Sequence, residues 1–199
     1  MTECAPIIGY ADWKDTKLYS CGKAAMNMSI CIDSSDPQNV PGEVLVKGPN
    51  VFLGYFKNEE ATAEVMDKDG WFHTGDMGVM DDEGFLFLKG RSKCMILGPS
   101  GQNIYPEEIE GVLNNVTYVV DSLVIEDHGT LVSLIYPDYH QAELDGLSKS
   151  ELEAKLQETL PEINKQIPNY AKITKMEFMP EDFERTPKRS IKRYLYQRN

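Results

Sequence analysis

Residues 90–96, GRSKCMI, and residues 101–110, GQNIYPEEIE, form the stretch that decides the fold. An apolar segment ends at Gly90-Arg91, a glycine-bearing loop follows, and Pro106 then begins an acid-rich segment. Proline fits the first turn of a helix and acidic side chains stabilise that end, so a helix is predicted over 106–116. The pattern of the chain changes here, and a domain boundary is therefore predicted at residues 91–93.

The part before this boundary is predicted to be mostly β with one helix. Two apolar segments, 23–33 and 43–48, flank the turn-forming residues 34–42, and two more, 70–76 and 84–90, flank an acidic turn. The helix is expected within 55–65, where Asn58 is a suitable N-cap.

The part after the boundary is predicted to be a compact α+β unit. Apolar segments 118–126 and 130–136 enclose Asp127-His128-Gly129, which indicates a hairpin. Leucines at helical spacing predict an amphipathic helix over 148–160, extended or followed by another turn over 162–167. A strand is expected over 173–179, and the end of the chain is expected to be irregular and then helical from Ser190.

Composition and charge argue against a membrane-spanning, a secreted and a nucleic-acid-binding protein. The chain has 199 residues, 41% of them hydrophobic, and no apolar run near the ~20 residues that span a bilayer. The four cysteines lack a Cys-x-x-Cys spacing, and the N-terminus lacks a secretory pattern, so a reduced cytoplasmic protein without structural zinc is expected. Six basic residues and no acidic one lie in 185–199, which leaves 14 basic against 32 acidic residues, a net charge of −18, over 1–184. An acidic body disfavours nucleic acid as a partner.

Together with Thr74-Gly75-Asp76, the stretch that decides the fold resembles the hinge signature of the adenylate-forming enzymes, which include acyl-CoA synthetases, luciferases and peptide-synthetase adenylation domains. The resemblance implies an α+β fold in two parts. Residues 1–92 would be the incomplete, mostly β end of a large ATP-binding domain with a barrel-like subdomain, and residues 93–199 the small mobile lid. The motifs look most similar to the long-chain fatty-acid–CoA ligases.

The resemblance also implies roles at the nucleotide. Thr2-Glu3 is similar to the end of the family's Tyr-Gly-x-Thr-Glu segment, so Thr2 is expected to contact a phosphate and Glu3 to hold Mg²⁺. With Met1 at the x position, the chain is expected to be a C-terminal fragment. Asp76 in the Thr74-Gly75-Asp76 motif corresponds to the family's ribose-binding aspartate. A carboxylate suits this role, because it can accept hydrogen bonds from both vicinal hydroxyls. Arg91 corresponds to the arginine on the ribose and phosphate side.

Three positions of the second part are implied to act in domain motion and CoA binding. Lys93 stands at the family's hinge. Gly98 and Gly101 flank Pro99-Ser100, and the glycine matching Gly101 lets the backbone approach the pantetheine arm of CoA. The alternative is an ordinary loop.

The catalytic lysine is the point where this chain departs from the family. The family segment is Pro-Lys-Thr-x-x-Gly-Lys-x-x-Arg, and its lysine stabilises charge during adenylation. Counting four residues from Thr186 reaches Ser190, which cannot do this. A register with two extra residues reaches Lys192, the preferred candidate, with Lys188 in reserve. A degenerate site and a merely solvated basic end remain alternatives.

The implied function is part of an ATP-dependent carboxylate–CoA ligase that acts on a fatty acid with ATP, Mg²⁺ and CoA. The remainder of the large domain is its expected partner; peripheral membrane contact stays open. The fragment is expected to be inactive alone, since it lacks the phosphate loop and the acyl pocket. Two alternatives stand beside this: a free-standing, non-enzymatic module that binds a nucleotide, CoA or a protein, and a fragment of a carrier-protein-dependent adenylation enzyme.

Overall fold

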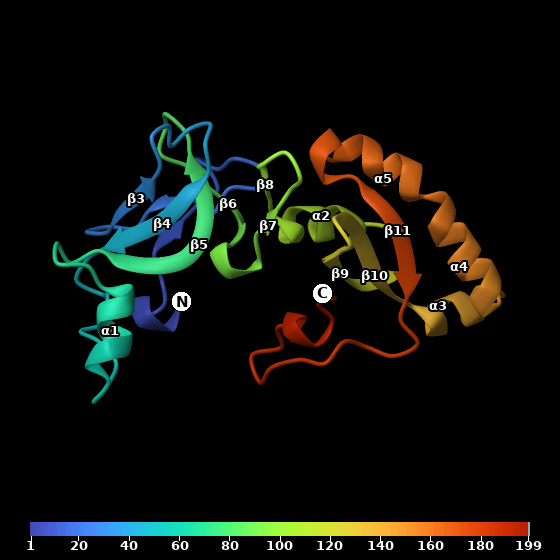
Figure 1. Ribbon diagram of the computed structural model, residues 1–199. Coiled ribbons are helices and arrows are strands. Elements are labelled where there is room, and N and C mark those ends of the chain that lie inside the picture. Colours follow the sequence, from blue (N-terminus) through green and yellow to red (C-terminus); the bar gives the residue numbers. More distant parts are fainter. Residues whose placement is uncertain (199) are drawn as a thin grey trace. The chain divides into compact units, whose positions relative to one another are not determined.

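The computed structural model describes residues 1–198 (Figure 1). The chain divides into two compact units, unit 1 over Met1–Lys93 and unit 2 over Cys94–Asn199. Both mix sheet with helix, so the predicted α+β class is confirmed. Across the described residues, no helix is long and apolar enough to cross a membrane.

Unit 1 is built on an antiparallel sheet with the strand order β3-β4-β5-β6. Its elements are the 3-10 turn Thr2–Cys4, β1 (Gly9–Tyr10), β2 (Lys23–Ala24), β3 (Ser29–Asp33), β4 (Gly42–Lys47), α1 (Glu59–Val65), β5 (Phe72–Met80) and β6 (Leu86–Arg91). Within the described residues β3 and β6 are not paired with each other, so the expected barrel-like subdomain is an open sheet here. The strand expected over 23–33 is interrupted, because Asn27 takes a left-handed backbone conformation with φ of 63°.

The N-cap predicted for the helix of unit 1 is confirmed. Asn58 caps α1, and its side-chain oxygen accepts from the Ala61 N–H at 3.1 Å. The core lies under alternate residues of the strands, among them Ile32, Val44 and Val46. Cys4 joins this core fully buried, and thereby fixes the Thr2–Cys4 turn against the sheet.

Unit 2 centres on β10 (Thr130–Pro137), which pairs antiparallel with β9 (Val119–Asp127) and parallel with β11 (Ile173–Phe178). Its other elements are β7 (Ile96–Leu97), β8 (Asn103–Ile104), α2 (Pro106–Leu113), α3 (Tyr139–Leu144), α4 (Lys149–Glu158), α5 (Leu160–Gln166) and the 3-10 turns Ser92–Cys94, Asn169–Ala171 and Arg193–Leu195, the first of which crosses the unit boundary. His128 and Gly129 connect β9 to β10 with φ of 47° and 78°. Two positive φ values in a two-residue loop define the type I′ turn that suits a hairpin.

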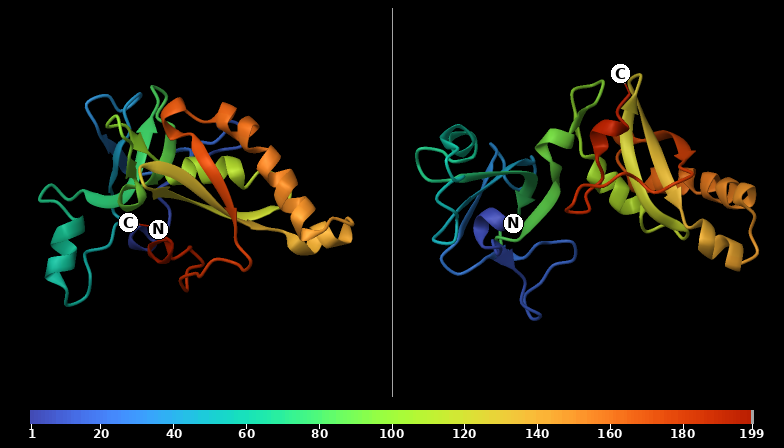
Figure 2. Two further views of the ribbon diagram at one scale, coloured as in Figure 1. Left: turned by 45° about the vertical axis from the view of Figure 1, so that its right-hand side comes forward. Right: turned by 90° about the horizontal axis from the view of Figure 1, so that it is seen from below.

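The sheet of unit 2 is covered on both faces (Figures 1 and 2). Helices α2, α4 and α5 pack on one face, where Leu113, Leu152 and Ile163 are buried with Val124 and Ile135. The other face is covered by the C-terminal segment 180–198, hereafter the tail, through Phe183, Ile191 and Tyr196. Alternation along β9 and β10 produces these two faces, since successive side chains of a strand point to opposite sides.

The structure of unit 2 contains one helix that was not predicted and corrects one expectation for the tail. Helix α3 was not predicted, although Asp138 caps it by accepting from the Gln141 N–H at 2.9 Å. The tail is not helical from Ser190; it forms only a short 3-10 turn over Arg193–Leu195, because its contacts with the sheet keep the preceding residues extended.

Three arginines hold the tail to the rest of unit 2. Arg185 contacts Asp121 at 2.8 Å, and Arg193 forms a two-point ion pair with Glu110. Arg198 contacts Asp127 at 3.0 Å and Glu177. Much of the positive charge that the sequence places at this end is therefore neutralised inside the unit.

Acid should weaken this attachment. Hydrogen bonds from Arg198 and Lys175 lower the pKa of Glu177 to about 2 from its ordinary value near 4.5. Between pH 4.5 and 2 the unfolded chain then binds more protons than the folded one, so the stabilisation is present above 4.5 and is lost as the pH falls toward 2. The free energy of unfolding, measured with urea, should fall more steeply with decreasing pH in the wild type than in Arg198→Ala. Lys188→Ala, which removes a charge from an exposed position, should keep the wild-type slope; equal slopes for wild type and Arg198→Ala would refute the assignment.

Candidate functional site

The segment Thr74-Gly75-Asp76 forms a bulge in β5. Register between β4 and β5 passes from Glu43 opposite Met77 to Leu45 opposite His73, so three residues of β5 lie opposite Val44 alone. The buried Thr74 hydroxyl donates to the Val44 carbonyl at 2.8 Å and accepts from the Asp76 N–H at 3.1 Å. Gly75 turns the chain with φ of 70°. A bulge re-aims the side chain that follows it, here Asp76.

Glu43 braces this bulge from the neighbouring strand. One carboxylate oxygen accepts from the Gly75 N–H at 2.9 Å, and the other lies 2.8 Å from His73 Nδ1. His73 is thereby occupied by a structural contact.

The bulge brings Asp76 and Arg91 together. The two residues are cross-strand partners of β5 and β6, and Arg91 Nη1 donates to Asp76 Oδ1 at 2.6 Å. The Asp76 side chain is 24% exposed and that of Arg91 51%, so the pair lies at the surface of unit 1. The second carboxylate oxygen and the remaining guanidinium donors give this pair capacity for a ligand with vicinal hydroxyls and a phosphate.

Thr2 and Glu3 lie in the first turn of unit 1. Thr2 is exposed and Glu3 is half-buried. The Glu3 carboxylate accepts one long hydrogen bond, from the Tyr55 hydroxyl at 3.4 Å. Mg²⁺ in proteins is commonly held by one or two carboxylates together with phosphates of a ligand, and a carboxylate engaged this weakly fits that requirement.

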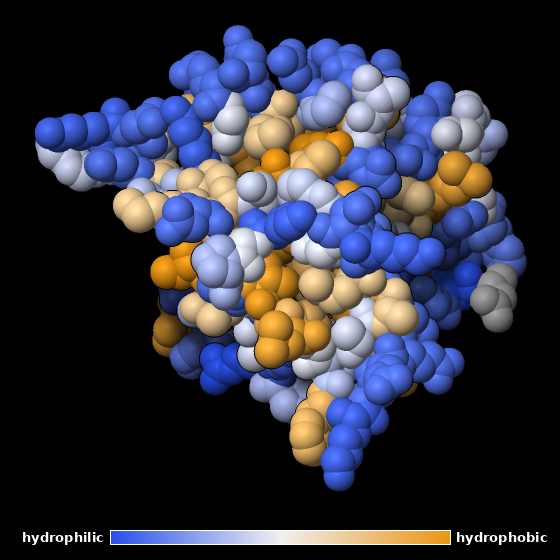
Figure 3. Space-filling model, turned by 90° about the vertical axis from the view of Figure 1, so that its left-hand side faces the viewer, coloured by the Kyte–Doolittle hydropathy of each residue, from blue (hydrophilic) through white to orange (hydrophobic). Residues whose placement is uncertain are grey.

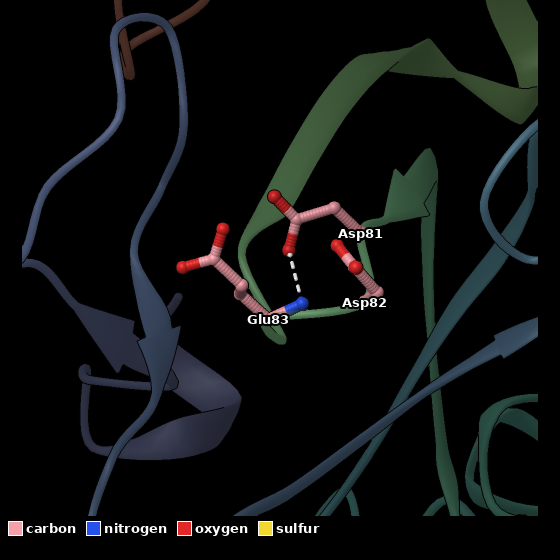
Figure 4. A group of neighbouring side chains, drawn as sticks. All are labelled: Asp81, Asp82 and Glu83. Carbon is pink, nitrogen blue, oxygen red and sulfur yellow. Dashed lines mark hydrogen bonds between the residues drawn. The ribbon is translucent and has the colours of Figure 1, made fainter.

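A second acidic group of unit 1 is structural. Asp81, Asp82 and Glu83 lie together in the turn between β5 and β6, and among the described residues they are the one group of three or more potential metal-ligating side chains with these atoms within 4.8 Å of one another (Figure 4). Lys17 contacts Asp81 at 2.5 Å and Glu83 at 2.7 Å, and lowers the pKa of the Asp81 carboxyl through its hydrogen bond. Asp81 also accepts from the Phe85 N–H at 2.9 Å. This group therefore stabilises a turn.

Lys93 lies in the 3-10 turn Ser92–Cys94 with an exposed side chain, at the end of unit 1.

The glycine loop of unit 2 is a tight turn between β7 and β8. The Gly98 N–H donates to the Gln102 carbonyl at 2.8 Å, and the Gly101 N–H donates to the Gly98 carbonyl at 2.9 Å. A Cβ at Gly98 would lie 3.2 Å from Ile104 Cδ1, a tight contact that the Ile104 side chain would have to relieve. Gly101 has φ of 81°, and a Cβ there would face open space. The backbone at Gly101 is thus accessible to a ligand.

A pocket of about 350 Å³ adjoins this loop within unit 2. Its lining includes Leu97, Gly98 and Pro99 of the loop, together with Tyr170 and Lys172. The lining combines apolar surface with one cation, Lys172, and one carboxylate, Glu126, which suits a ligand with an apolar arm and polar groups. Tyr170 and Lys172 were not predicted as site residues, because their one local signal is a polar turn before the strand at 173, which many proteins share.

Lys192 lies on a short hairpin in the tail. Arg185 pairs with Ile191, and the Lys192 N–H donates to the Glu184 carbonyl at 2.8 Å. The Lys192 ammonium donates to Glu184 Oε2 at 3.0 Å, which raises the pKa of Lys192 and keeps it charged. Lys188 and Ser190 are exposed at the hairpin turn.

Comparison with known proteins shows the family of the chain. The profile of the AMP-binding enzyme C-terminal domain matches residues 95–199, more than half of the chain, and that of the AMP-binding enzyme matches residues 1–56. The chain belongs to the AMP-binding enzymes.

Two curated relatives and one solved structure of CoA ligases are similar to this chain in sequence or in fold. The chain is 46% identical over 118 residues to the 2-succinylbenzoate–CoA ligase of Bacillus cytotoxicus, covering 58% of the chain and 24% of that protein. It is 45% identical over 118 residues to a long-chain-fatty-acid–CoA ligase of Escherichia coli, covering 57% and 21%. The O-succinylbenzoate–CoA synthetase of Bacillus subtilis, in complex with ATP and magnesium, superposes with a TM-score of 0.81 at 28% identity, covering 98% and 39%. The match thus spans about a quarter of the curated relatives' length.

Proposed function

We propose that the chain is the C-terminal portion of an AMP-forming carboxylate–CoA ligase. Unit 1 would be the end of the large ATP-binding domain and unit 2 the mobile lid. The observation that carries the proposal is the Asp76–Arg91 pair, which the Thr74 bulge holds at the surface of unit 1. Such a pair matches the ribose and phosphate of a nucleotide.

The first half-reaction would activate the carboxylate. A carboxylate oxygen attacks the α-phosphorus of ATP, the bond to the bridging oxygen breaks, and pyrophosphate leaves with the electron pair. Asp76 and Arg91 would hold the ribose side, Thr2 a phosphate, and Lys192 the charge that develops at the α-phosphate. Glu3 would hold Mg²⁺, which neutralises phosphate charge when bound.

The second half-reaction would transfer the acyl group to CoA. The CoA thiolate attacks the carbonyl carbon of the acyl-adenylate, and AMP leaves with the bonding electrons. Lys93 would be the hinge between the two reaction states. The Gly98–Gly101 loop would admit the pantetheine arm, and Lys172 in the adjacent pocket would face a CoA phosphate.

The finer substrate proposal is a long-chain fatty acid. The motifs 90–93 and 103–110 and the similarity to the Escherichia coli fatty-acid ligase support it, whereas the relative from Bacillus cytotoxicus is a 2-succinylbenzoate ligase. The test is to incubate the full-length protein with ATP and either fatty acids or aryl carboxylates, and to identify acyl-AMP and acyl-CoA by mass spectrometry. Acyl-CoA from fatty acids supports the proposal; aryl products correct the substrate, transfer only to a carrier protein corrects the acceptor, and no adenylate with any acid refutes it.

The proposal also accounts for the surface of unit 1. Six large apolar side chains there are at least 78% exposed: Trp13, Leu18, Tyr19, Met26, Leu53 and Phe56. Figure 3 shows hydrophobic surface on one face of the molecule. Isolated domains rarely expose so much apolar surface, and the remainder of the large domain is the partner we propose for it. We place the enzyme in the cytoplasm, which the four free cysteines support.

Gly101→Asn should slow thioester formation roughly 10-fold to 100-fold in the full-length protein, because a side chain would obstruct the approach of pantetheine. Asparagine tolerates the left-handed conformation of Gly101, so the loop should keep its fold. Gly146→Asn is the matched control, since Gly146 has φ of 80° and open space around it. The rate of acyl-CoA formation from synthetic acyl-adenylate is the measurement, and an unchanged rate in Gly101→Asn would exclude this role.

A further inference from the structure

Glu43 contacts the bulge of β5 at two residues at once. Its Oε1 accepts from the Gly75 N–H at 2.9 Å, and its Oε2 lies 2.8 Å from His73 Nδ1. These two partners lie on either side of Thr74, whose hydroxyl donates to the Val44 carbonyl at 2.8 Å. Each of the three residues of the bulge is therefore tied to β4, and two of them are tied through a single carboxylate.

The regular pairing of strands is interrupted on both sides of this part of β5. Pairing with β4 shifts between Glu43 and Leu45, and pairing with β6 shifts between Met77 and Gly78. A bulge leaves backbone groups without their regular ladder partners, so these groups need another partner. The Glu43 carboxylate accepts from the Gly75 N–H, and a charged acceptor makes the stronger kind of hydrogen bond.

The bulge also carries contacts of the Asp76–Arg91 pair. Arg91 Nη1 donates to the Thr74 carbonyl at 3.3 Å as well as to Asp76 Oδ1 at 2.6 Å. The Asp76 N–H donates to the Thr74 hydroxyl at 3.1 Å. A shift of the bulge would therefore displace the carboxylate and the guanidinium together.

The backbone from which the Glu43 side chain extends is closely packed. A Cβ at the preceding residue, Gly42, would lie 2.1 Å from the Asp33 carbonyl oxygen, so β3 and β4 approach tightly there. The Glu43 side chain is 27% exposed. A hydrogen bond that is partly shielded from water is stronger than one in full solvent, so Glu43 can hold the bulge firmly.

We propose that Glu43 is a positioning residue of the nucleotide site. It holds Gly75 and His73, and thereby fixes the orientation of Asp76 and Arg91 before the nucleotide binds. The inference rests on the function proposed above, which gives the ribose and phosphate side to Asp76 and Arg91. The property that matters is the reach of the two carboxylate oxygens to both partners, and the negative charge is secondary.

The test measures AMP binding to variants of the full-length protein by isothermal titration calorimetry. Glu43→Ala should raise the Kd for AMP roughly 10-fold, because the Gly75 N–H loses its acceptor. Glu43→Gln should stay within about 2-fold of the wild type, since an amide can accept from Gly75 and donate to His73. Glu43→Asp keeps the charge on a shorter side chain that cannot span both partners, and should raise the Kd roughly 5-fold. Asp33→Ala is the matched control and should keep the wild-type Kd, because it removes an exposed carboxylate directly opposite Glu43 on β3.

The stoichiometry separates positioning from folding, since a partly unfolded preparation would bind fewer equivalents of AMP at an unchanged Kd. If Glu43→Ala does not fold, the order of the two conservative variants decides. Tighter binding by Glu43→Gln than by Glu43→Asp supports positioning, whereas the reverse order shows that charge matters and overturns the proposal. An unchanged Kd in both Glu43→Ala and Glu43→Asp would also overturn it. Wild-type protein that does not bind AMP would instead refute the proposed function, so the two failures are distinguishable.

Discussion

Lys192→Ala in the full-length protein is expected to lower the rate of adenylation by roughly 10²–10³-fold, the typical loss when one preorganised electrostatic contact to a transition state is removed. The Lys192 ammonium is charged and oriented before substrate arrives, because Glu184 holds it at 3.0 Å across the hairpin and raises its pKa. Alanine removes this charge from the hairpin.

Thioester formation should survive this change, because CoA attack on a preformed acyl-adenylate needs no cation at an attacked phosphorus. Stopped assays of pyrophosphate release and of acyl-CoA formation separate the two steps. Lys165→Ala, which removes a lysine from the surface of α5, is the control and should leave both steps unchanged. If Lys192→Ala adenylates at the wild-type rate, Lys192 is not the cation.

Arg193→Met should lower the free energy of unfolding of unit 2 by about 3 kcal/mol, the range seen when one partner of a buried ion pair is removed. Arg193 contacts both oxygens of Glu110 and lies 3.7 Å from Glu107. Without it, a nearly buried carboxylate would keep the Val124 N–H as its remaining hydrogen-bond donor among the contacts described. Burial already raises the pKa of Glu110, and loss of the arginine would raise it further.

The double variant Glu110→Gln/Arg193→Met should be less destabilised than Arg193→Met, because a neutral amide still accepts from Val124 and leaves no unpaired charge. Denaturant unfolding of the 199-residue chain, followed by probes in unit 2, measures the free energy of unfolding of both variants. An Arg193→Met variant that unfolds at the wild-type denaturant concentration would show that the ion pair contributes nothing to the attachment of the tail.

Several elements could be predicted from the sequence because their causes are local. The Asn58 cap and the two-residue turn at His128-Gly129 depend on residues within one or two turns of chain. The helix begun by Pro106 is of the same kind. Helix α3 was missed because it is only six residues long, too short for a periodic pattern.

The candidate site was partly predictable for a similar reason. Asp76 and Arg91 were identified from motifs, but their contact depends on the register of β5 with β6 and on the bulge held by Thr74. Tyr170 and Lys172 belong to the pocket only because β11 runs parallel to β10, a pairing between segments about 40 residues apart. No short-range pattern encodes such a pairing.

By itself, the sequence determined the order of the motifs, the change of pattern at residues 91–93 and the resemblance to adenylate-forming enzymes, since these depend on residue types and spacings. Only the tertiary structure decided which charges of the tail are engaged. Arg185, Arg193 and Arg198 are paired with carboxylates far away in the chain, whereas Lys192 is paired with Glu184 within the tail itself. The physical reason is that an ion pair depends on distance in space, and Glu110 and Asp121 lie near the tail only in the folded unit.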